Sequence, residues 1–143
     1  MHPQDSILLI DDSPGECELF CLALKHTGLD IPLYTEQDAE AAFHFLAHRS
    51  VLPSLILLDW HLRNQHGGQF LKRLRADSRF ATIPLVVFTT SDDASDLLNG
   101  YAHGANGYVV KPGTFDELVR CVTDLCGYWL RWNRTTVTVE TRC

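Results

Sequence analysis

Short, mostly apolar segments alternate with helix-like segments along nearly the whole chain. The apolar segments cover residues 6–10, 31–35, 55–59, 83–90 and 106–110, and they do not follow the apolar-polar alternation of half-exposed strands. Strands that are apolar on both faces are typical of parallel sheets, whose two sides are covered by helices. The order of the segments therefore predicts repeated βα units around a parallel sheet of five strands.

A predicted helix follows each strand, and the first has clear start and stop signals. Ser13 can cap it, Pro14 suits its first turn, and Glu16 completes a capping box. Gly28 supplies the stop. The remaining helices are predicted at residues 38–49, 67–77, 92–103 and 114–132. We expect the helix at 92–103 to be the least stable, because it contains a glycine.

The chain of 143 residues is long enough for one domain and shows no internal repeat or linker. We therefore predict a single doubly wound α/β domain at residues 1–132. Residues 133–143 are predicted to be a C-terminal extension without a separate output domain. The β-branched alternation of this extension fits an added edge strand, a partner-binding arm or a disordered tail, and the sequence leaves these three open.

Charge and hydropathy exclude several classes of protein. The formal net charge is −6, whereas a nucleic-acid-binding surface is normally basic. No segment approaches the ~20 apolar residues that span a bilayer, and the N-terminus lacks the basic region of a signal peptide. We expect a cytoplasmic protein without nucleic-acid or membrane partners.

The five cysteines show no Cys-x-x-Cys spacing. We expect them to be small buried apolar residues in a reducing compartment. The alternative is a redox pair between two neighbouring helices, drawn from Cys17, Cys21, Cys121 and Cys126.

Polar side chains follow four of the five predicted strands, at the point where each strand ends. The first strand ends on Asp11 and Asp12, the third on Asp59, the fourth on Thr89 and the fifth on Lys111. Open α/β sheets bind ligands at the carboxyl ends of their strands. Each residue alone has an ordinary explanation, such as a helix cap, a turn residue or a solvated charge, but four strand ends together predict one site.

The chemistry of this set indicates phosphoryl transfer. Three close carboxylates repel one another, and a hard divalent cation such as Mg²⁺ relieves the repulsion while binding phosphate oxygens. Lys111 adds a positive charge and Thr89 a hydroxyl donor. Asp59 would then be a carboxylate nucleophile that becomes an acyl phosphate.

Four motifs carry a family resemblance that covers about residues 6–130. The segments "LLIDDSPGE", "LILLDWHLRNQHGG", "PLVVFTTS" and "GANGYVVKP" closely resemble the response-regulator receiver domain of two-component signalling. The resemblance implies a flavodoxin-like fold with strand order 2-1-3-4-5 and five helices. It also implies a phosphoacceptor with autophosphatase activity rather than a turnover enzyme.

The resemblance assigns a role to each residue of the set. Asp59 corresponds to the phospho-acceptor that receives the phosphoryl group from a histidine kinase phosphohistidine, and Thr89 and Tyr108 correspond to the switch residues. Lys111 corresponds to the lysine that contacts the phosphoryl group, and the family often holds the bond to Pro112 in the cis form. The Mg²⁺ ligands implied are Asp11, Asp12, Asp59 and the backbone carbonyl of His61.

Several positions depart from the usual family pattern. Arg63 stands where many members have proline, and His66 stands where many have an acid, so we expect a more mobile loop before Gly67. His61 and Ser91 occupy positions that tune dephosphorylation in the family.

The segments "TTS", "GANGY" and "GYWL" near the end resemble stand-alone receivers that partner bacterial phytochrome-type and related hybrid histidine kinases. In such a protein the output is a contact with a downstream protein partner. The expected contact surface, and a possible homodimer interface, is the face of helix 4, strand 5 and helix 5, with Tyr101, Tyr108 and Phe115.

Three other interpretations are weaker. A degenerate receiver that signals without phosphorylation would not need the intact set of acceptor, metal and switch residues. A haloacid-dehalogenase-type phosphatase needs a second Asp where His61 stands. A flavin or dinucleotide module needs a Gly-rich loop after the first strand, where Asp11 and Asp12 lie instead.

Overall fold

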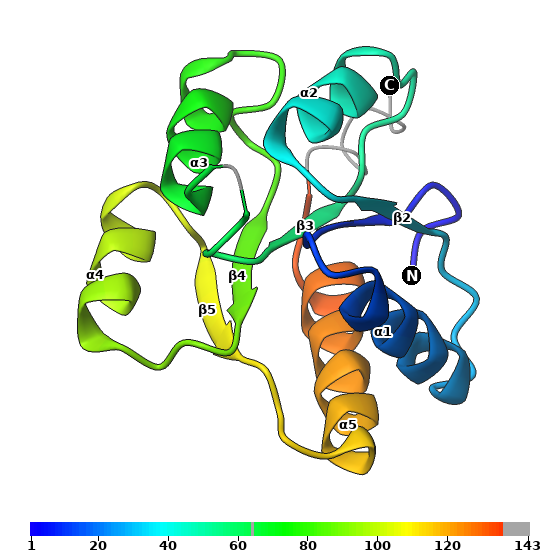
Figure 1. The fold of residues 1–143 in the computed structure, drawn as a ribbon. Coiled ribbons are helices and arrows are strands. Elements are labelled where there is room, and N and C mark those ends of the chain that lie inside the picture. The colour runs from blue at the N-terminus through cyan, green and yellow to red at the C-terminus, as the bar shows by residue number, and fades with distance from the viewer. Residues whose placement is uncertain (64, 136–143) are drawn as a thin grey trace.

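The computed structural model describes residues 1–63 and 65–135, and its centre is a sheet of five parallel strands (Figure 1). The strands lie in the order β2-β1-β3-β4-β5. Their bounds are Ile7–Ile10 for β1, Leu33–Glu36 for β2, Leu55–Leu58 for β3, Leu85–Thr89 for β4 and Gly107–Val110 for β5. The predicted doubly wound, flavodoxin-like fold and its strand order are confirmed.

Five helices cover the two faces of this sheet. Helices α1 and α5 lie together on one face, and α2 and α3 lie on the other, with α4 beside the β5 edge (Figure 1). The helices are α1 (Pro14–His26), α2 (Ala39–Ala47), α3 (Gly67–Ala76), α4 (Ala94–Ala102) and α5 (Phe115–Cys126). Within the described residues, no helix is long and apolar enough to cross a membrane.

The core consists of two apolar layers, one on each side of the sheet. In β1, Leu8 and Ile10 pack toward α2 and α3, whereas Ile7 and Leu9 pack toward α1 and α5. All four of these side chains are buried. Every side chain of a strand that is covered on both faces is buried, which explains the continuous apolar sequence of β1.

The helix ends differ from prediction in two places. The fifth helix was expected to continue to residue 132, but α5 ends at Cys126 and a six-residue π-helix, Gly127–Trp132, follows it.

At the start of α1, Ser13 accepts a hydrogen bond from the backbone N–H of Glu16 (3.2 Å). The N–H of Ser13 donates to Asp11 (2.9 Å), and the carboxylate of Glu16 lies 3.7 Å from Lys111. In a capping box the Glu16 carboxylate would also accept a hydrogen bond from the N–H of Ser13. That half of the prediction is wrong.

Helix α4 packs loosely, and Gly100 is its one buried residue. A β-carbon at this position would lie 3.3 Å from the ring of Tyr108 and 3.6 Å from Val87. The glycine therefore lets the helix approach β5 closely, at a cost of about 1 kcal/mol in helix propensity.

Candidate phosphoryl-transfer site

The parallel register brings the three predicted carboxylates together. Ile10 of β1 pairs with Leu58 of β3, so the residues that follow them, Asp11 and Asp59, leave the same edge of the sheet side by side. One carboxylate oxygen each from Asp11, Asp12 and Asp59 lies within 4.8 Å of the other two. Asp11 is buried, and the other two acids are half-buried.

Lys111 brings a positive charge to this cluster from the end of β5. Its Nζ lies 2.6 Å from Asp11 Oδ2 and 3.7 Å from both Asp59 Oδ2 and Glu16 Oε2. The lysine side chain is 8% exposed and that of Asp11 is 2% exposed. Burial alone would lower the pKa of Lys111, but the hydrogen bond and charge of Asp11 and the charges of the other acids outweigh it, and its pKa is raised. Lys111 is therefore firmly protonated.

Burial raises the pKa of Asp59, and Asp11 adds to this effect by repulsion. Lys111 and a hydrogen bond from the hydroxyl of Thr89 act in the opposite direction without cancelling it. These surroundings disfavour the ionised form of Asp59. A cation in addition to Lys111 would stabilise it. Three carboxylates with only oxygen donors form the ligand set that hard divalent cations take, so the cluster fits a divalent metal site.

Thr89 and Tyr108 both contact Ser91 in the β4–α4 loop. Thr89 ends β4 as a buried residue, and its Oγ1 accepts a 3.4 Å hydrogen bond from the N–H of Ser91. Tyr108 is half-buried, and its hydroxyl donates to the backbone carbonyl of Ser91 (2.8 Å). The two predicted switch residues therefore meet at the β4–α4 loop.

His61 contacts Asp59 through its backbone, while its side chain turns to a different partner. Its N–H donates to Asp59 Oδ1 (3.4 Å), and its ring Nε2 donates to Asp96 Oδ2 (2.7 Å). Ser91 Oγ donates to the same oxygen of Asp96 (2.6 Å). Asp96 was not predicted, because an acid in the first turn of a helix is ordinarily explained by the helix dipole.

The departures from the family pattern have local partners in the structure. Arg63 Nε lies 4.0 Å from Asp12 Oδ2 as an exposed ion pair. His66 is the N-cap of α3, and its Nδ1 accepts from the N–H of Gly68 (3.2 Å). A β-carbon on Gly67 would lie 3.0 Å from the carbonyl oxygens of Asp59 and Trp60. Glycine is therefore favoured where this loop packs against the backbone of Asp59 and Trp60.

Two further expectations are settled by the backbone and the cysteines. No peptide bond among the described residues is cis, so the expectation of a cis bond between Lys111 and Pro112 is wrong.

The four described cysteines are free, with Cys17 and Cys126 buried and the other two half-buried. Burial raises the pKa of Cys17 to about 11 and that of Cys126 to about 12. This agrees with the expected apolar role.

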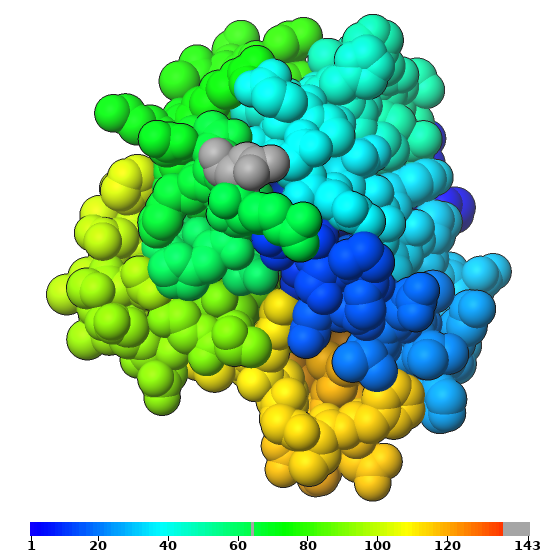
Figure 2. Space-filling model, viewed as in Figure 1, coloured from blue at the N-terminus to red at the C-terminus, as the bar shows by residue number. Residues whose placement is uncertain are grey.

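The site lies where segments distant in sequence meet on one face of the molecule. The start of α1 (blue), the β3–α3 loop (green) and the β5–α5 loop (yellow) come together there (Figure 2). Next to it, a cavity of about 210 Å³ between α1 and the β5–α5 loop is lined by Asp11, Glu16 and Lys111 together with aromatic and aliphatic side chains.

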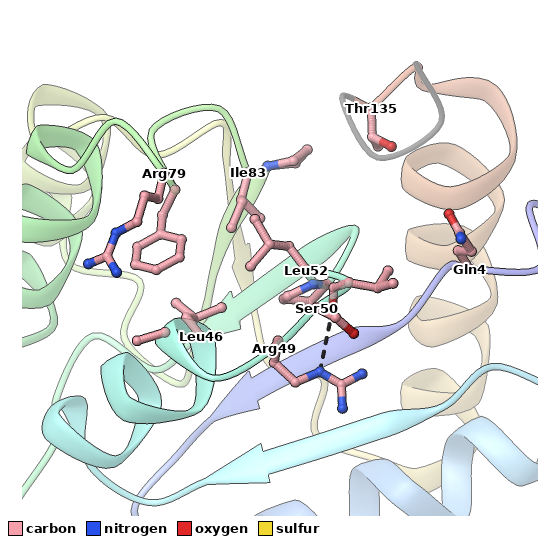
Figure 3. Close-up of a pocket in the computed structure, with 13 residues that line it drawn as sticks. Gln4, Leu46, Arg49, Ser50, Leu52, Arg79, Ile83 and Thr135 are labelled. Atoms are coloured by element: carbon pink, nitrogen blue, oxygen red, sulfur yellow. Dashed lines mark hydrogen bonds between the residues drawn. The ribbon is translucent and has the colours of Figure 1, made fainter. Parts of the chain in front are cut away.

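A second cavity, of about 450 Å³, contains none of these acids. It lies at the amino end of the sheet among the loops after α2 and α3, and Leu46, Arg49, Ile83 and Thr135 are among the residues that line it (Figure 3). Arg49 Nε donates to the carbonyl of Val51 (3.4 Å) at its edge. The volume of a cavity therefore does not indicate where the acidic cluster lies in this molecule.

Curated proteins of similar length resemble the chain. The Probable methanogenesis regulatory protein FilR2 of Methanothrix harundinacea (strain 6Ac) is 34% identical over 134 residues, which cover 90% of this chain and 86% of that protein. Response regulator Rcp1 of Synechocystis sp. is 31% identical over 134 residues, covering 90% of this chain and 91% of Rcp1.

Solved structures have the same fold. The Mn²⁺-bound form of Rcp1 aligns with a TM-score of 0.80 at 30% identity, covering 92% of this chain and 98% of that one. The phosphorylated cyanobacterial phytochrome response regulator RcpA aligns with a TM-score of 0.84 at 26% identity, covering 92% and 97%. The family model for the response regulator receiver domain matches residues 7–123. With most of its length accounted for in this way, the chain belongs to the response regulator receiver domain family of two-component signalling.

Proposed function

We propose that this protein is a response regulator that accepts a phosphoryl group on Asp59 from the phosphohistidine of a histidine kinase. The observation that carries the proposal is the convergence of three carboxylates, a buried lysine and a buried threonine hydroxyl at the carboxyl ends of four parallel strands. Asp59 is the acid among these that receives both the Lys111 charge and the Thr89 hydroxyl.

Transfer requires one bond to form and one to break. An oxygen of Asp59 attacks phosphorus, the P–N bond to the histidine breaks, and the electron pair stays on the imidazole, which takes a proton from solvent. Lys111 stands where it can neutralise charge on the phosphoryl oxygens, and Thr89 can donate its hydroxyl to one of them. The acyl phosphate is later hydrolysed, which returns Asp59 to its free carboxylate. The protein thus acts as a phosphoacceptor that carries a signal and not as a turnover enzyme.

The residues that would hold Mg²⁺ are Asp11, Asp12, Asp59 and the backbone carbonyl of His61. When bound, the cation would neutralise the acids and allow a phosphate to approach them. The relative Rcp1 is described in an Mn²⁺-bound form, which supports the proposal that the acidic cluster of this chain binds a divalent ion. The hydrogen bond from the His61 N–H to Asp59 (3.4 Å) orients this stretch of backbone beside the acceptor.

The partner that supplies the phosphoryl group is proposed to be a histidine kinase of the phytochrome type. RcpA is described as a phosphorylated phytochrome response regulator, and its fold covers nearly all of this chain. The output is proposed to be a protein contact on α4, β5 and α5, with homodimerisation as one form of it. Exposed apolar side chains on this face support the proposal: Leu98 is 69% exposed, Tyr101 50% and Val110 43%.

Beryllofluoride tests the proposed acceptor, because it mimics an acyl phosphate without turnover. We expect beryllofluoride with Mg²⁺ to raise the melting temperature of the wild-type protein by several degrees, and to leave that of Asp59→Asn unchanged. Asp77→Asn, which alters a half-buried acid paired with the exposed Arg79 at the end of α3, is the matched control and should respond like wild type. A response in Asp59→Asn equal to that of wild type would refute the proposal.

Two alternatives are separated by related outcomes. A degenerate receiver, acting as a phosphorylation-independent interaction module, would show no Asp59-dependent response to beryllofluoride or to small phosphoryl donors. A phosphatase with an aspartyl nucleophile would hydrolyse p-nitrophenyl phosphate in many turnovers. The side chain of His61 bonds to Asp96, and it stands where such a phosphatase needs a second Asp.

A further inference from the structure

Asp96 joins the two loops that border the acceptor. Its Oδ2 accepts hydrogen bonds from His61 Nε2 (2.7 Å) and from Ser91 Oγ (2.6 Å). His61 belongs to the β3–α3 loop, two residues after Asp59, and Ser91 belongs to the β4–α4 loop, two residues after Thr89. Asp96 itself lies in the first turn of α4. One carboxylate oxygen thus connects the β3–α3 loop with the β4–α4 loop and with the start of α4, where Asp96 lies 35 residues after His61.

Asp96 is the more buried partner of this bridge, whereas the side chain of His61 is 55% exposed. The side chain of Asp96 is 15% exposed, and hydrogen bonds to a carboxylate at these distances are charge-assisted. Both donors point to the same carboxylate oxygen, an arrangement that fits an acid accepting from the two side chains at once. The two residues that Asp96 binds are also linked to the site through their backbones. The His61 N–H donates to Asp59 (3.4 Å), and the Ser91 N–H donates to Thr89 (3.4 Å).

We propose that Asp96 is a positioning residue that sets the lifetime of the phosphoryl group on Asp59 by holding the His61 and Ser91 loops together. The proposal rests on the proposed function of the site. Hydrolysis requires a water oxygen to attack phosphorus as the bond to the Asp59 oxygen breaks; the electron pair returns to the carboxylate, and the water proton leaves with the phosphate or solvent. The two loops border Asp59 and Thr89, so a link that restrains them is expected to slow the approach of water to phosphorus.

The test measures the rate of loss of the phosphoryl group after loading with acetyl phosphate and Mg²⁺ and removal of the donor. We expect Asp96→Ala to lose the group about three- to tenfold faster than wild type, the change expected for one lost charge-assisted link. Asp96→Asn keeps the shape with weaker acceptance and should lie between the two. Asp92→Ala removes a neighbouring exposed acid and should leave the lifetime unchanged.

A double-mutant cycle separates this positioning role from a general loss of structure. If the bridge carries the effect, His61→Ala also shortens the lifetime, and adding Asp96→Ala to it causes no further change. Melting temperatures of the four proteins serve as the check on folding. A wild-type lifetime in Asp96→Ala, or effects that add fully in the double variant, would overturn the inference while leaving Asp59 as acceptor. Failure of the wild-type protein to take up any phosphoryl group would overturn both proposals.

Discussion

Replacing Lys111 by methionine removes the buried positive charge of the site while keeping most of the side-chain volume. The lysine Nζ is 2.6 Å from Asp11 and 3.7 Å from Asp59, and all three side chains are at most 15% exposed. At an effective dielectric constant of 20, a charge pair at 4 Å contributes about 4 kcal/mol of attraction and the shorter Asp11 contact contributes more, which the dehydration of the lysine partly offsets. Glu16, at 44% exposed, adds little.

We expect Lys111→Met to lose about 3–5 kcal/mol of unfolding free energy in EDTA, the cost of leaving a buried carboxylate without its partner. For a chain of this size, that loss lowers the melting temperature by roughly 10–15 °C. Mg²⁺ should then stabilise the variant more than the wild type, because the acids no longer share their charge with a lysine. Binding at a hundred times the dissociation constant adds about 2.7 kcal/mol.

Urea unfolding followed by circular dichroism, with EDTA and with Mg²⁺, measures both quantities. Lys72→Met, on the exposed side of α3, is the matched control and should change stability by less than about 0.5 kcal/mol. The reasoning fails if Lys111→Met is as stable as Lys72→Met in EDTA. It also fails if Mg²⁺ stabilises the variant less than it stabilises the wild type.

Three further predictions concern packing in other parts of the molecule and in the loop before α3. Because burial raises the pKa of Cys17 to about 11 and of Cys126 to about 12, the thiolate fraction at pH 8 is roughly one in a thousand or less. Iodoacetamide labelling of both, read by mass spectrometry, should therefore be slow and rise about tenfold per pH unit. Gly67→Ala should lose about 1–3 kcal/mol in urea unfolding, because its methyl group would lie 3.0 Å from two backbone oxygens. Arg75→Met should lose about 2–4 kcal/mol by the same assay, since the guanidinium donates to three backbone carbonyls and to Asn106.

Each of these has its own control. Complete labelling of the cysteines in urea shows that the reagent is competent, and equally fast labelling of the folded protein would contradict the burial. Gly113→Ala has open space around its β-carbon and should be nearly neutral. A stability of Arg75→Met within about 0.5 kcal/mol of wild type would mean that the guanidinium bonds contribute nothing.

The sheet and the meeting of the acids were predictable because both follow from backbone periodicity. A continuous apolar strand must be covered on two faces, and parallel strands bring their carboxyl ends to one edge. Asp11 and Asp59 follow paired residues of β1 and β3, so their proximity needs no knowledge of side-chain conformations. The strand order itself came from the family resemblance and not from the pattern.

The contacts between loops were not predictable, because they depend on side-chain directions across long separations in sequence. Asp96 lies 35 residues from His61, and an acid at the start of a helix already has a local explanation. Glu16 matched a capping box by its spacing, but it turns to Lys111 instead. The change from α5 to a π-helix after Cys126 was also missed, although Gly127 stands at the boundary. A single glycine is tolerated inside a continuous helix, so it does not by itself mark such a change.

The most direct measurement of the central claim is the location of the phosphoryl group after reaction with phosphoramidate, whose P–N bond is that of a phosphohistidine. Peptide mass spectrometry of the protein treated with Mg²⁺ and trapped with borohydride should place a single modification on Asp59. The modification should disappear in EDTA and in Asp59→Asn. Modification at another residue, or equal modification of Asp59→Asn, would contradict the assignment of Asp59 as the phospho-acceptor.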